Sequence, residues 1–436
     1  MLGVLKNRTY RHLFLAQVIA LIGTGLATVA LGLLAFNLAG ENAGAVLGTA
    51  LAIKMIAYVG VAPIASAFAE RLPRRAMLVT LDLVRAAVAL LLPFVSEIWQ
   101  VYVLIFVLQS ASAAFTPTFQ ATIPDVLPDE KEYTRALSLS RLAYDLESVA
   151  SPLLAAALLT VISFNNLFAG TVIGFIASAL LVVSVVLPSP KPVAPRGIYD
   201  RTTRGLRIYL NTPRLRGLLA LTLAVSAAGS MVIVNTVVLV QSVFGLTQQS
   251  TAVALTAFGG GSMIAALALP RLLDRFDDRP VMLIGAGILV ATMLASAALP
   301  GYSVLLGLWV IIGVGYSVTQ TPAGRLIRRS SNPEDRPALF AAQFALSHAA
   351  WLVTYPLAGW LGASAGLPVT FLVMAAVAAL GLVAALRLWP VDDPVIIEHT
   401  HDDLPADHPH LNGSPDKRAH AHGFVIDAEH TVWPGR

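Results

Sequence analysis

The sequence predicts an all-α integral membrane protein with twelve transmembrane helices, arranged as two parallel six-helix repeats. Three observations lead to this prediction. Of the 436 residues, 56% are hydrophobic and only 12% are charged, whereas soluble domains carry roughly 25% charged residues. Twelve apolar stretches are each long enough to cross a bilayer. Landmarks of the first half also recur in the second half at a nearly constant offset.

The composition excludes several classes of protein. A soluble fold of this length could not bury so much apolar surface, so we do not expect a cytosolic enzyme, a secreted module or a nucleic-acid-binding protein. The chain contains no cysteine, which excludes disulfides, thiolate catalysis and Cys-based metal sites. The formal charge of +4 does not indicate nucleic acid, because a membrane protein usually carries its basic excess in cytoplasmic loops. Neither a catalytic cluster nor an ATP-binding motif is evident, so we expect no enzymatic activity.

The candidate spans follow one another with short connections. The first follows Lys6, Arg8 and Arg11 and lacks a cleavage site, so we expect it to be retained. Gly259-Gly260-Gly261 lies inside an apolar span, which indicates close helix packing and not a phosphate-binding loop. The predicted spans cover residues 12–38, 44–69, 76–95, 99–119, 136–161, 165–187, 214–241, 248–272, 280–299, 303–323, 338–362 and 367–389.

Basic residues predict the orientation of the spans, because they occur only in every second connection. The connections near 39–43, 96–98, 162–166, 242–247, 300–302 and 363–366 contain no Lys or Arg. The alternate connections hold clusters such as Arg71, Arg74 and Arg75, or Arg325, Arg328 and Arg329. By the positive-inside rule both termini are cytoplasmic. We expect a multi-pass protein of the plasma membrane, with the lipid bilayer as its partner.

An internal repeat divides the chain. The pairs recurring about 204 residues apart are Thr116-Pro117 with Thr321-Pro322, Ser151-Pro152 with Tyr355-Pro356, and Glu70-Arg71 with Asp274-Arg275. The resulting division is an N-terminal six-helix bundle (1–188), a basic cytoplasmic linker (189–213), a C-terminal six-helix bundle (214–390) and an acidic, His-rich cytoplasmic tail (391–436). Two parallel six-helix repeats are the plan of a transporter fold that binds substrate near the membrane midplane.

The connection between the second and third spans carries the most specific motif. Residues 66–75 read S-A-F-A-E-R-L-P-R-R, which resembles the G-x-x-x-[DE]-[RK]-x-G-[RK]-[RK] motif of the major facilitator superfamily, with Ser66 and Pro73 in place of the glycines. The resemblance covers residues 1–390. The candidate family positions are Glu70, Arg71, Arg74, Arg75, Asp82 and Arg85, with Asp274, Arg275 and Arg279 in the second copy at 270–279.

The motif predicts a conformational latch. Charged groups at the inner helix ends can pair across the two halves in one state and separate in the other, which needs only a few kcal/mol. The alternative is that these arginines serve only as topology anchors.

Ionisable residues within the spans are rare, and such residues are functional candidates by default because burying them is costly. The candidates are Lys54, Asp145, Glu147 and His348, with Arg141 one helical turn before Asp145. Each of the first four lies about ten residues into its span, roughly 15 Å deep and near the midplane. Two carboxylates and an imidazole suit a divalent cation, and a buried carboxylate also suits proton coupling.

Structural alternatives exist for each of these residues. Asp145 is four residues after Arg141, so the two could form a local ion pair. Asp145 and Glu147 point about 200° apart on a regular helix. His348 could be a hydrogen-bonded packing residue. Lys54 could neutralise a carboxylate, bind an anion or extend toward the membrane surface.

The C-terminal segment from about residue 391 differs sharply from the rest. It holds seven of the nine histidines: His399, His401, His408, His410, His420, His422 and His430. Nine acidic and three basic residues give it a net charge of −6. We expect it to be largely disordered without a ligand, because it is polar, Pro-rich and short. Its three H-x-H pairs predict binding of nickel, cobalt, zinc or copper; a merely solvated tail is the alternative.

The tail and the charged fifth span together resemble nickel- and cobalt-resistance exporters of the superfamily. This resemblance implies a secondary exporter of divalent cations, driven by proton entry and working by alternating access. One alternative is a multidrug or other small-organic exporter, and another is a metal sensor that does not transport. We expect no cofactor apart from a transported or tail-bound metal, a small ion or molecule as substrate, protons as coupling ions, and no nucleic acid.

Overall fold

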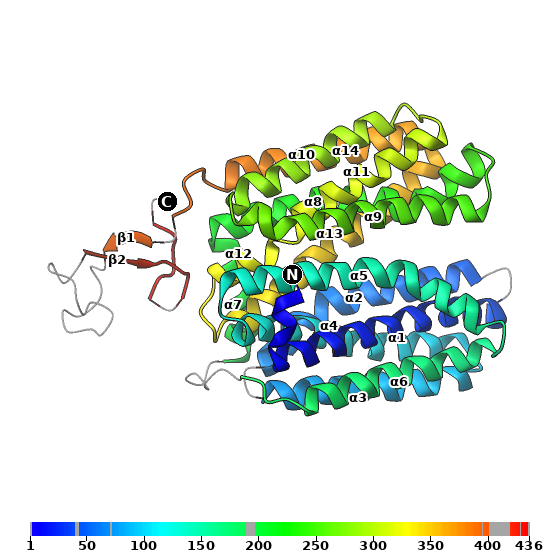
Figure 1. The fold of residues 1–436 in the computed structure, drawn as a ribbon, viewed down its shortest axis with the longest axis horizontal. Helices are drawn as coiled ribbons and strands as arrows, with labels where there is room; N and C mark the ends of the chain where they lie inside the picture. The colour runs from blue at the N-terminus through cyan, green and yellow to red at the C-terminus, as the bar shows by residue number, and fades with distance from the viewer. Residues whose placement is uncertain are drawn as a thin grey trace.

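Two bundles of six long helices lie side by side (Figure 1). A computed structural model of the chain describes residues 2–39, 43–69, 72–188, 197–394, 396–400, 419–427 and 429–434. The first bundle holds α1 (Arg8–Ala39), α2 (Ala43–Ala69), α3 (Arg74–Leu91), α4 (Ile98–Val126), α5 (Glu130–Leu158) and α6 (Phe164–Val183). The second holds α8 (Pro213–Val237), α9 (Gln248–Leu273), α10 (Asp278–Ser296), α11 (Tyr302–Gln320), α13 (Arg336–Ser364) and α14 (Leu367–Leu388). The predicted all-α fold of twelve helices in two repeats is confirmed.

Shorter elements connect and extend these helices. They are η1 (Leu2–Lys6) and η3 (Leu92–Phe94), which are 3₁₀-helices, the π-helix η4 (Val238–Val243), α7 (Ile198–Asn211), α12 (Ala323–Arg329), β1 (Ile396–Thr400) and β2 (Ala419–Gly423). Helix ends follow local chemistry. The side chain of Asp129 accepts a 2.8 Å hydrogen bond from the backbone N–H of Glu132 and so caps α5. Gly366 adopts φ +80° and allows the sharp turn between α13 and α14.

Eleven helices within the described residues are long and apolar enough to span a membrane. The twelfth long helix, α5, does not meet this standard. Arg141, Asp145 and Glu147 lie in its central turns, and charges at that depth are tolerated only where they face protein or water. Helix α5 therefore carries charges that must face protein or water.

The two bundles meet through equivalent pairs of helices. Helix α2 packs on α13, and α5 packs on α9. The second and fifth helices of one repeat thus face the fifth and second helices of the other, as a two-fold arrangement requires. Apolar side chains such as Ala62, Ala113 and Phe344 fill part of this interface. The interface is accordingly symmetric in its helices, although its charged residues are not symmetric.

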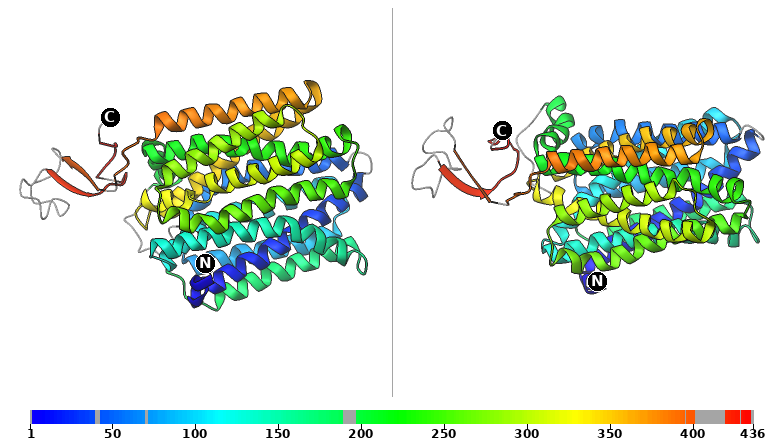
Figure 2. Two further views of the ribbon diagram at one scale, coloured as in Figure 1. Left: turned by 45° about the horizontal axis from the view of Figure 1, so that its top comes forward. Right: turned by 90° about the horizontal axis from the view of Figure 1, so that it is seen from above.

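One end of the two bundles carries most of the described basic connections. Helices α7 and α12 and the described part of the tail all lie at this end, as the views agree (Figures 1 and 2). We call it the basic end. The starts of α3, α5, α10 and α13 also lie here, because alternate helices of a short-looped bundle begin at the same end.

The linker and the tail differ from their predicted descriptions. Within the predicted linker at 189–213, residues 198–211 form α7, which packs on α13 and α2 and buries Ile208 and Tyr209. The tail was predicted to be largely disordered, but its described parts form an antiparallel pair of strands, β1 and β2. Phe424 and Ile426, which follow β2, are buried. In both segments, spaced apolar side chains pack against a surface of the bundles. The composition of a segment alone does not indicate such packing.

The close packing predicted for Gly259-Gly260-Gly261 yields a test of the fold. A Cβ atom added at Gly261 would lie 2.0 Å from the carbonyl oxygen of Val310 on α11, and one added at Gly313 would lie 2.0 Å from that of Phe258 on α9. Nothing lies within 4 Å of such an atom at Gly260. We expect Gly261→Ala to destabilise the protein by roughly 3 kcal/mol, because backbone must move. Gly260→Ala is the matched control and should leave the melting temperature unchanged or slightly higher. Equal melting temperatures for the two variants would contradict this packing.

Candidate functional site

Arg141 joins the two bundles near the middle of α5. Its guanidinium forms an ion pair with Asp145 one turn along the same helix. Its Nε also donates to Ser262 Oγ on α9 at 3.0 Å, and its guanidinium lies 4.7 Å from the centre of the Tyr316 ring on α11. Asp145 is 4% exposed. The local Arg141–Asp145 pair, one of the alternatives drawn from the sequence, is therefore present and also contacts the second bundle.

Glu147 faces a different part of the first bundle. A Cβ atom added at Gly25 on α1 would lie 2.5 Å from Glu147 Oε1, so this carboxylate lies directly against the α1 backbone. The charges of Glu147 and Lys54 on α2 are close enough to interact. Lys54 Nζ lies 5.5 Å from the centre of the Tyr58 ring. The two carboxylates of α5 thus lie in separate surroundings, as their predicted angular separation requires: Asp145 pairs with Arg141, whereas Glu147 lies against α1.

His348 lies on α13 among aromatic rings. Its Nδ1 is 2.7 Å from the backbone oxygen of Phe344, one turn earlier. Its ring centre lies 4.7 Å from that of Tyr58 and 4.2 Å from that of Phe344. If His348 were protonated, its positive charge would be repelled by the positive charge of Lys54. These contacts agree with the interpretation of His348 as a packing residue. They place it beside Tyr58, the ring that Lys54 also approaches.

The carboxylates and His348 do not converge on a common point. Within the described residues, the group of three or more side chains that could hold a metal ion lies in the tail and not at the midplane. The expectation that Asp145, Glu147 and His348 together form a divalent-cation site is therefore wrong for this conformation. The reason is that Asp145 is paired with Arg141, whereas Glu147 lies against α1.

A network of ion pairs closes the basic end between the bundles. Asp125 at the end of α4 pairs with Arg74 at the start of α3 and with Arg336 at the start of α13. Asp335, which precedes α13, accepts hydrogen bonds of 2.5 and 2.8 Å from Arg204 on α7. We call Arg74, Asp125 and Arg336 the basic-end gate. One carboxylate here neutralises arginines from both bundles.

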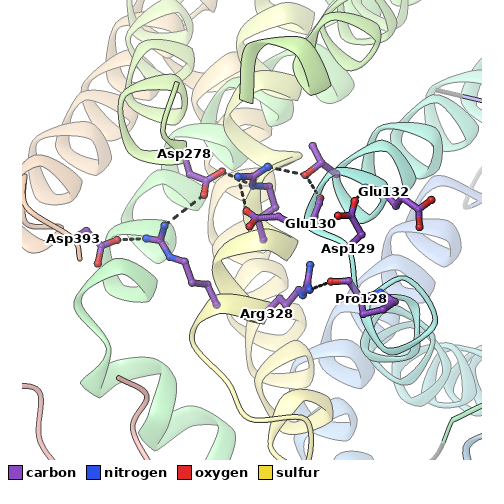
Figure 3. A network of polar contacts seen from close by, with 10 residues as sticks. Pro128, Asp129, Glu130, Glu132, Asp278, Arg328 and Asp393 are labelled. Carbon is purple, nitrogen blue, oxygen red and sulfur yellow. Dashed lines mark hydrogen bonds and ion pairs between the residues drawn. The ribbon is translucent and has the colours of Figure 1, made fainter. Parts of the chain in front are cut away.

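A second crossing lies beside the gate (Figure 3). Arg325 on α12 pairs with Glu130 on α5 at 2.7 Å and with Asp278 on α10 at 2.9 Å. Arg328 donates to the backbone oxygen of Pro128. These contacts join the end of the second bundle's fourth helix to the start of α5. Opening this end of the protein must break both crossings.

The predicted latch residues have mixed outcomes. Glu70 and Arg71 lie outside the described residues. Arg74 belongs to the gate, whereas Arg75 is half-buried and has no ion pair with a described residue. Asp274 and Arg275 are exposed and do not cross between the bundles, and Arg279 Nε donates to the Trp389 backbone oxygen at 3.1 Å within the second bundle. The second motif copy is therefore not a latch in this conformation, because it ends α9 on the surface.

Asp82 and Arg85 form a pair inside the first bundle, away from the second. Asp82 also accepts a 2.8 Å hydrogen bond from Ser178 on α6. The Arg85 guanidinium lies 4.0 Å from the Phe115 ring centre and 4.5 Å from that of Phe175. This pair fixes α3 to α4 and α6, so the prediction that it acts as a latch between the bundles is wrong for this conformation.

Sequence reasoning missed Asp125, Asp278, Arg325 and Arg336. The internal repeat of the sequence contains a signal for Asp125 and Asp278. At the offset of about 204 residues, Arg74 aligns with Asp278, and Asp125 aligns next to Arg329. Asp278 and Arg329 form an ion pair at 4.0 Å. The second repeat therefore keeps an ion pair at this place, but the acidic and basic residues have exchanged positions. A search for identical residues overlooks that exchange.

The tail histidines also have mixed outcomes. His399, His420, His422 and His430 come together so that one ligand atom from each lies within 4.8 Å of the others. His401, His408 and His410 lie outside the described residues. The described part of the predicted metal-binding set therefore forms a compact group.

Comparisons with known proteins agree on the family. The Major Facilitator Superfamily profile matches residues 13–252 and 218–406. Macrolide efflux protein A of Streptococcus pyogenes is 26% identical over 152 residues, covering 32% of this chain and 37% of that protein. The uncharacterized MFS-type transporter YfiS of Bacillus subtilis (strain 168) is 22% identical over 278 residues, covering 61% of this chain and 66% of that protein. The chain thus spans little more than a third of the macrolide relative.

Solved structures show the same fold at low sequence identity. The human organic anion transporter MFSD10 (TETRAN) superposes with a TM-score of 0.76 and 13% identity, over 87% of this chain and 99% of that one. A bacterial homologue of the iron transporter ferroportin, in an outward-facing state, has a TM-score of 0.73 and 15% identity over the same shares. These likenesses concern the fold alone.

Proposed function

This chain belongs to the major facilitator superfamily, and from this membership we propose that it is a proton-coupled carrier that exports small organic molecules from the cytoplasm. The observation that carries the proposal is the arrangement of α5. Asp145 in its centre pairs with Arg141, Glu147 lies separately against α1, and Arg141 extends to the second bundle. Arg141 thus places one charged group of this centre where the two halves meet.

The orientation follows from the basic residues. By the positive-inside rule, we infer that the basic end and both termini face the cytoplasm. The plasma membrane is the membrane that we propose for a carrier that exports from the cytoplasm. The basic-end gate is then the cytoplasmic gate, and it is closed in this structure. The arrangement supports alternating access, in which this gate opens to admit substrate from inside.

Aromatic side chains beside the charged centres support an organic substrate. Tyr58 and Phe344 pack with ring centres 4.8 Å apart between the bundles. Tyr316 lies over Arg141, and Trp351 lies on Tyr355 at 4.9 Å. Aromatic and apolar walls with a few fixed charges are typical of sites for small organic molecules. The name of the macrolide efflux relative agrees with this class.

Proton coupling is supported by Glu147, a half-buried carboxylate of α5 whose charge lies close enough to that of Lys54 for the two to interact. Protonation of the carboxylate removes one charge of the pair and frees the lysine from it. A substrate, or a change of conformational state, can therefore compete with the proton at Glu147 and Lys54. Such competition is sufficient for antiport.

Export of a divalent metal is the second candidate, and the four clustered histidines of the tail favour it. A direct test uses purified protein in liposomes with an imposed pH gradient, and follows erythromycin and Ni²⁺ in parallel. We expect gradient-dependent movement of the macrolide and none of Ni²⁺ above protein-free liposomes. Gradient-driven Ni²⁺ movement without macrolide movement would overturn the organic-substrate proposal and support the second candidate.

A further inference from the structure

Four histidines of the tail lie around one point beyond the basic end. The antiparallel pairing of β1 and β2 places His399 opposite His420. His422 lies two residues further along β2, on the same face. His430 follows in the next turn, and its ring centre is 4.8 Å from that of His399. Residues 31 positions apart in sequence are thus brought together by the strand pairing.

Hydrogen bonds assign the tautomers of three of these rings. Nδ1 of His399 is 3.0 Å from the Ile397 oxygen, and Nδ1 of His422 is 2.9 Å from the Gly423 oxygen. Nδ1 of His430 is 2.9 Å from Asp427 Oδ1. Because each of these oxygens is an acceptor, Nδ1 carries a proton, and in the neutral ring Nε2 then carries a lone pair. All three rings therefore present a nitrogen suited to a metal ion.

The approach of two of these nitrogens indicates a cation. Nε2 of His399 and Nε2 of His430 are 3.0 Å apart. In neutral rings with both protons on Nδ1, two lone pairs face each other, which is unfavourable unless a shared proton or a metal ion lies between them. Two nitrogens bound to one tetrahedral zinc ion at 2.0–2.1 Å are about 3.3 Å apart. The observed separation is close to that requirement.

The donor set defines the class of ion. Four imidazole nitrogens with no thiolate favour zinc, nickel, cobalt or copper(II) over magnesium and calcium. Asp427 supports the set, because it accepts from His430 Nδ1 and from the backbone N–H groups of Glu429 and His430. A carboxylate behind a ligating histidine orients the ring and strengthens the ligand.

The same segment is docked on the helices. Phe424 is 3% exposed, and its ring centre lies 4.9 Å from that of His399 and 5.1 Å from that of Trp433. The Arg214 guanidinium, at the start of α8, lies 5.0 Å from the Trp433 ring centre. Ile426 is buried, and with Asp427 it lines a cavity of about 120 Å³ against α7. The histidine group therefore shares its supporting side chains with the contact to the bundles.

Two charged routes lead from this docking surface to the gate. On one side, Asp427 and Arg204 line the same cavity, and Arg204 holds Asp335 next to the gate residue Arg336. On the other side, Asp393 pairs with both Arg214 and Arg329. Arg329 in turn shares Asp278 with Arg325 of the second crossing. The tail is thus continuous with both crossings that close the basic end.

We propose that His399, His420, His422 and His430 form a resident site for a divalent transition metal, whose occupancy holds the tail on α7 and α8 and stabilises the closed basic-end gate. A ligand that binds one state more tightly shifts the population toward that state. The site therefore acts as a metal-responsive brake on the carrier. This inference goes beyond the proposed export function and does not depend on which substrate is carried.

The binding experiment uses the full chain in detergent micelles, with Zn²⁺ measured by equilibrium dialysis. We expect one tight site per chain with a four-nitrogen shell in the X-ray absorption spectrum. The triple variant His399→Ala, His420→Ala, His422→Ala should bind this ion at least tenfold more weakly, and so should His430→Ala. The matched triple variant His401→Ala, His408→Ala, His410→Ala removes as many imidazoles and should keep the affinity. Equal losses of Zn²⁺ affinity in the two triple variants would overturn the assignment of the site to His399, His420, His422 and His430.

The gating experiment uses the absence of cysteine in the chain. Spin labels at Lys131→Cys on α5 and Arg271→Cys on α9 report the separation of the bundles at the basic end, and both positions are exposed. Saturating Zn²⁺ should increase the short-distance population in the parent. Trp433→Ala should still bind Zn²⁺ but lose this response. An unchanged distance distribution on adding Zn²⁺ to the parent would overturn the brake, whatever the flux assay shows for macrolide or Ni²⁺.

Discussion

Replacing Asp125 with Asn is expected to shift the carrier strongly toward the state that is open at the basic end. Asp125 is the carboxylate that Arg74 and Arg336 share, and these side chains are only 2% and 9% exposed. Removing one partner of a buried ion pair leaves charge uncompensated, at a cost of roughly 2–3 kcal/mol after discounting for the partial exposure of Asp125. That cost corresponds to about a 30- to 150-fold change in the ratio of closed to open molecules.

Spin-label distances between positions 131 and 271 measure this shift directly, and flux in liposomes measures its consequence. We expect the long-distance population to dominate and turnover to fall more than tenfold, because one state of the cycle is lost. Asp277→Asn is the matched control, since Asp277 is exposed and its side chain caps no backbone group. A distance distribution in Asp125→Asn equal to that of Asp277→Asn would mean that other contacts hold the gate.

The gate shows which parts of the protein a sequence discloses. The twelve spans are readable because the lack of water in a bilayer forces long apolar runs, and a run of 20 residues is a local property. The pairing of Asp125 with Arg336 is not local. It depends on α4 and α13 meeting at the interface of the two bundles, and a motif written for one connection gives no information on that meeting. Only Arg74 of the gate lies within the motif.

Helix α5 shows where a local pattern was sufficient. Arg141 and Asp145 are four apart, and Glu147 is two beyond Asp145, so helical geometry alone predicts one pair and one separate carboxylate. The structure places them so. The contacts of Arg141 with Ser262 and Tyr316 were not predictable in this way, because they need the packing of α5 on α9 and α11.

The tail shows the opposite case. Its composition is that of a segment without a core of its own, yet β1 and β2 pair across the residues between them. Phe424 and Ile426 lie in an otherwise polar segment, and their burial depends on a surface that α7 and α8 provide. For the described parts of the tail, the prediction of disorder is wrong because it treated the segment as if it stood alone. The H-x-H spacing still identified three of the four clustered histidines, whereas His430 joins through the turn at Asp427.

Replacing Glu147 with Gln should separate substrate movement from proton movement. The amide keeps the shape and hydrogen-bonding capacity of the side chain, but it cannot take up or release a proton in the relevant range, and it leaves Lys54 without its counter-charge. We expect efflux driven by a pH gradient to fall at least 100-fold, while exchange of labelled for unlabelled substrate without a gradient stays within about threefold of the parent.

The matched control is Glu132→Gln, in the first turn of the same helix and far from the midplane. It should reduce neither activity by more than a factor of about two. Asp145→Asn distinguishes the roles of the two carboxylates. Loss of the Asp145 charge frees Arg141 at the contact with α9, which should impair exchange as well as gradient-driven efflux. If Glu147→Gln retained full gradient-driven efflux, proton coupling would have to reside elsewhere, and the Arg141–Asp145 pair would be the next centre to examine. The division of labour on α5 thus becomes a measurable difference between two neighbouring carboxylates.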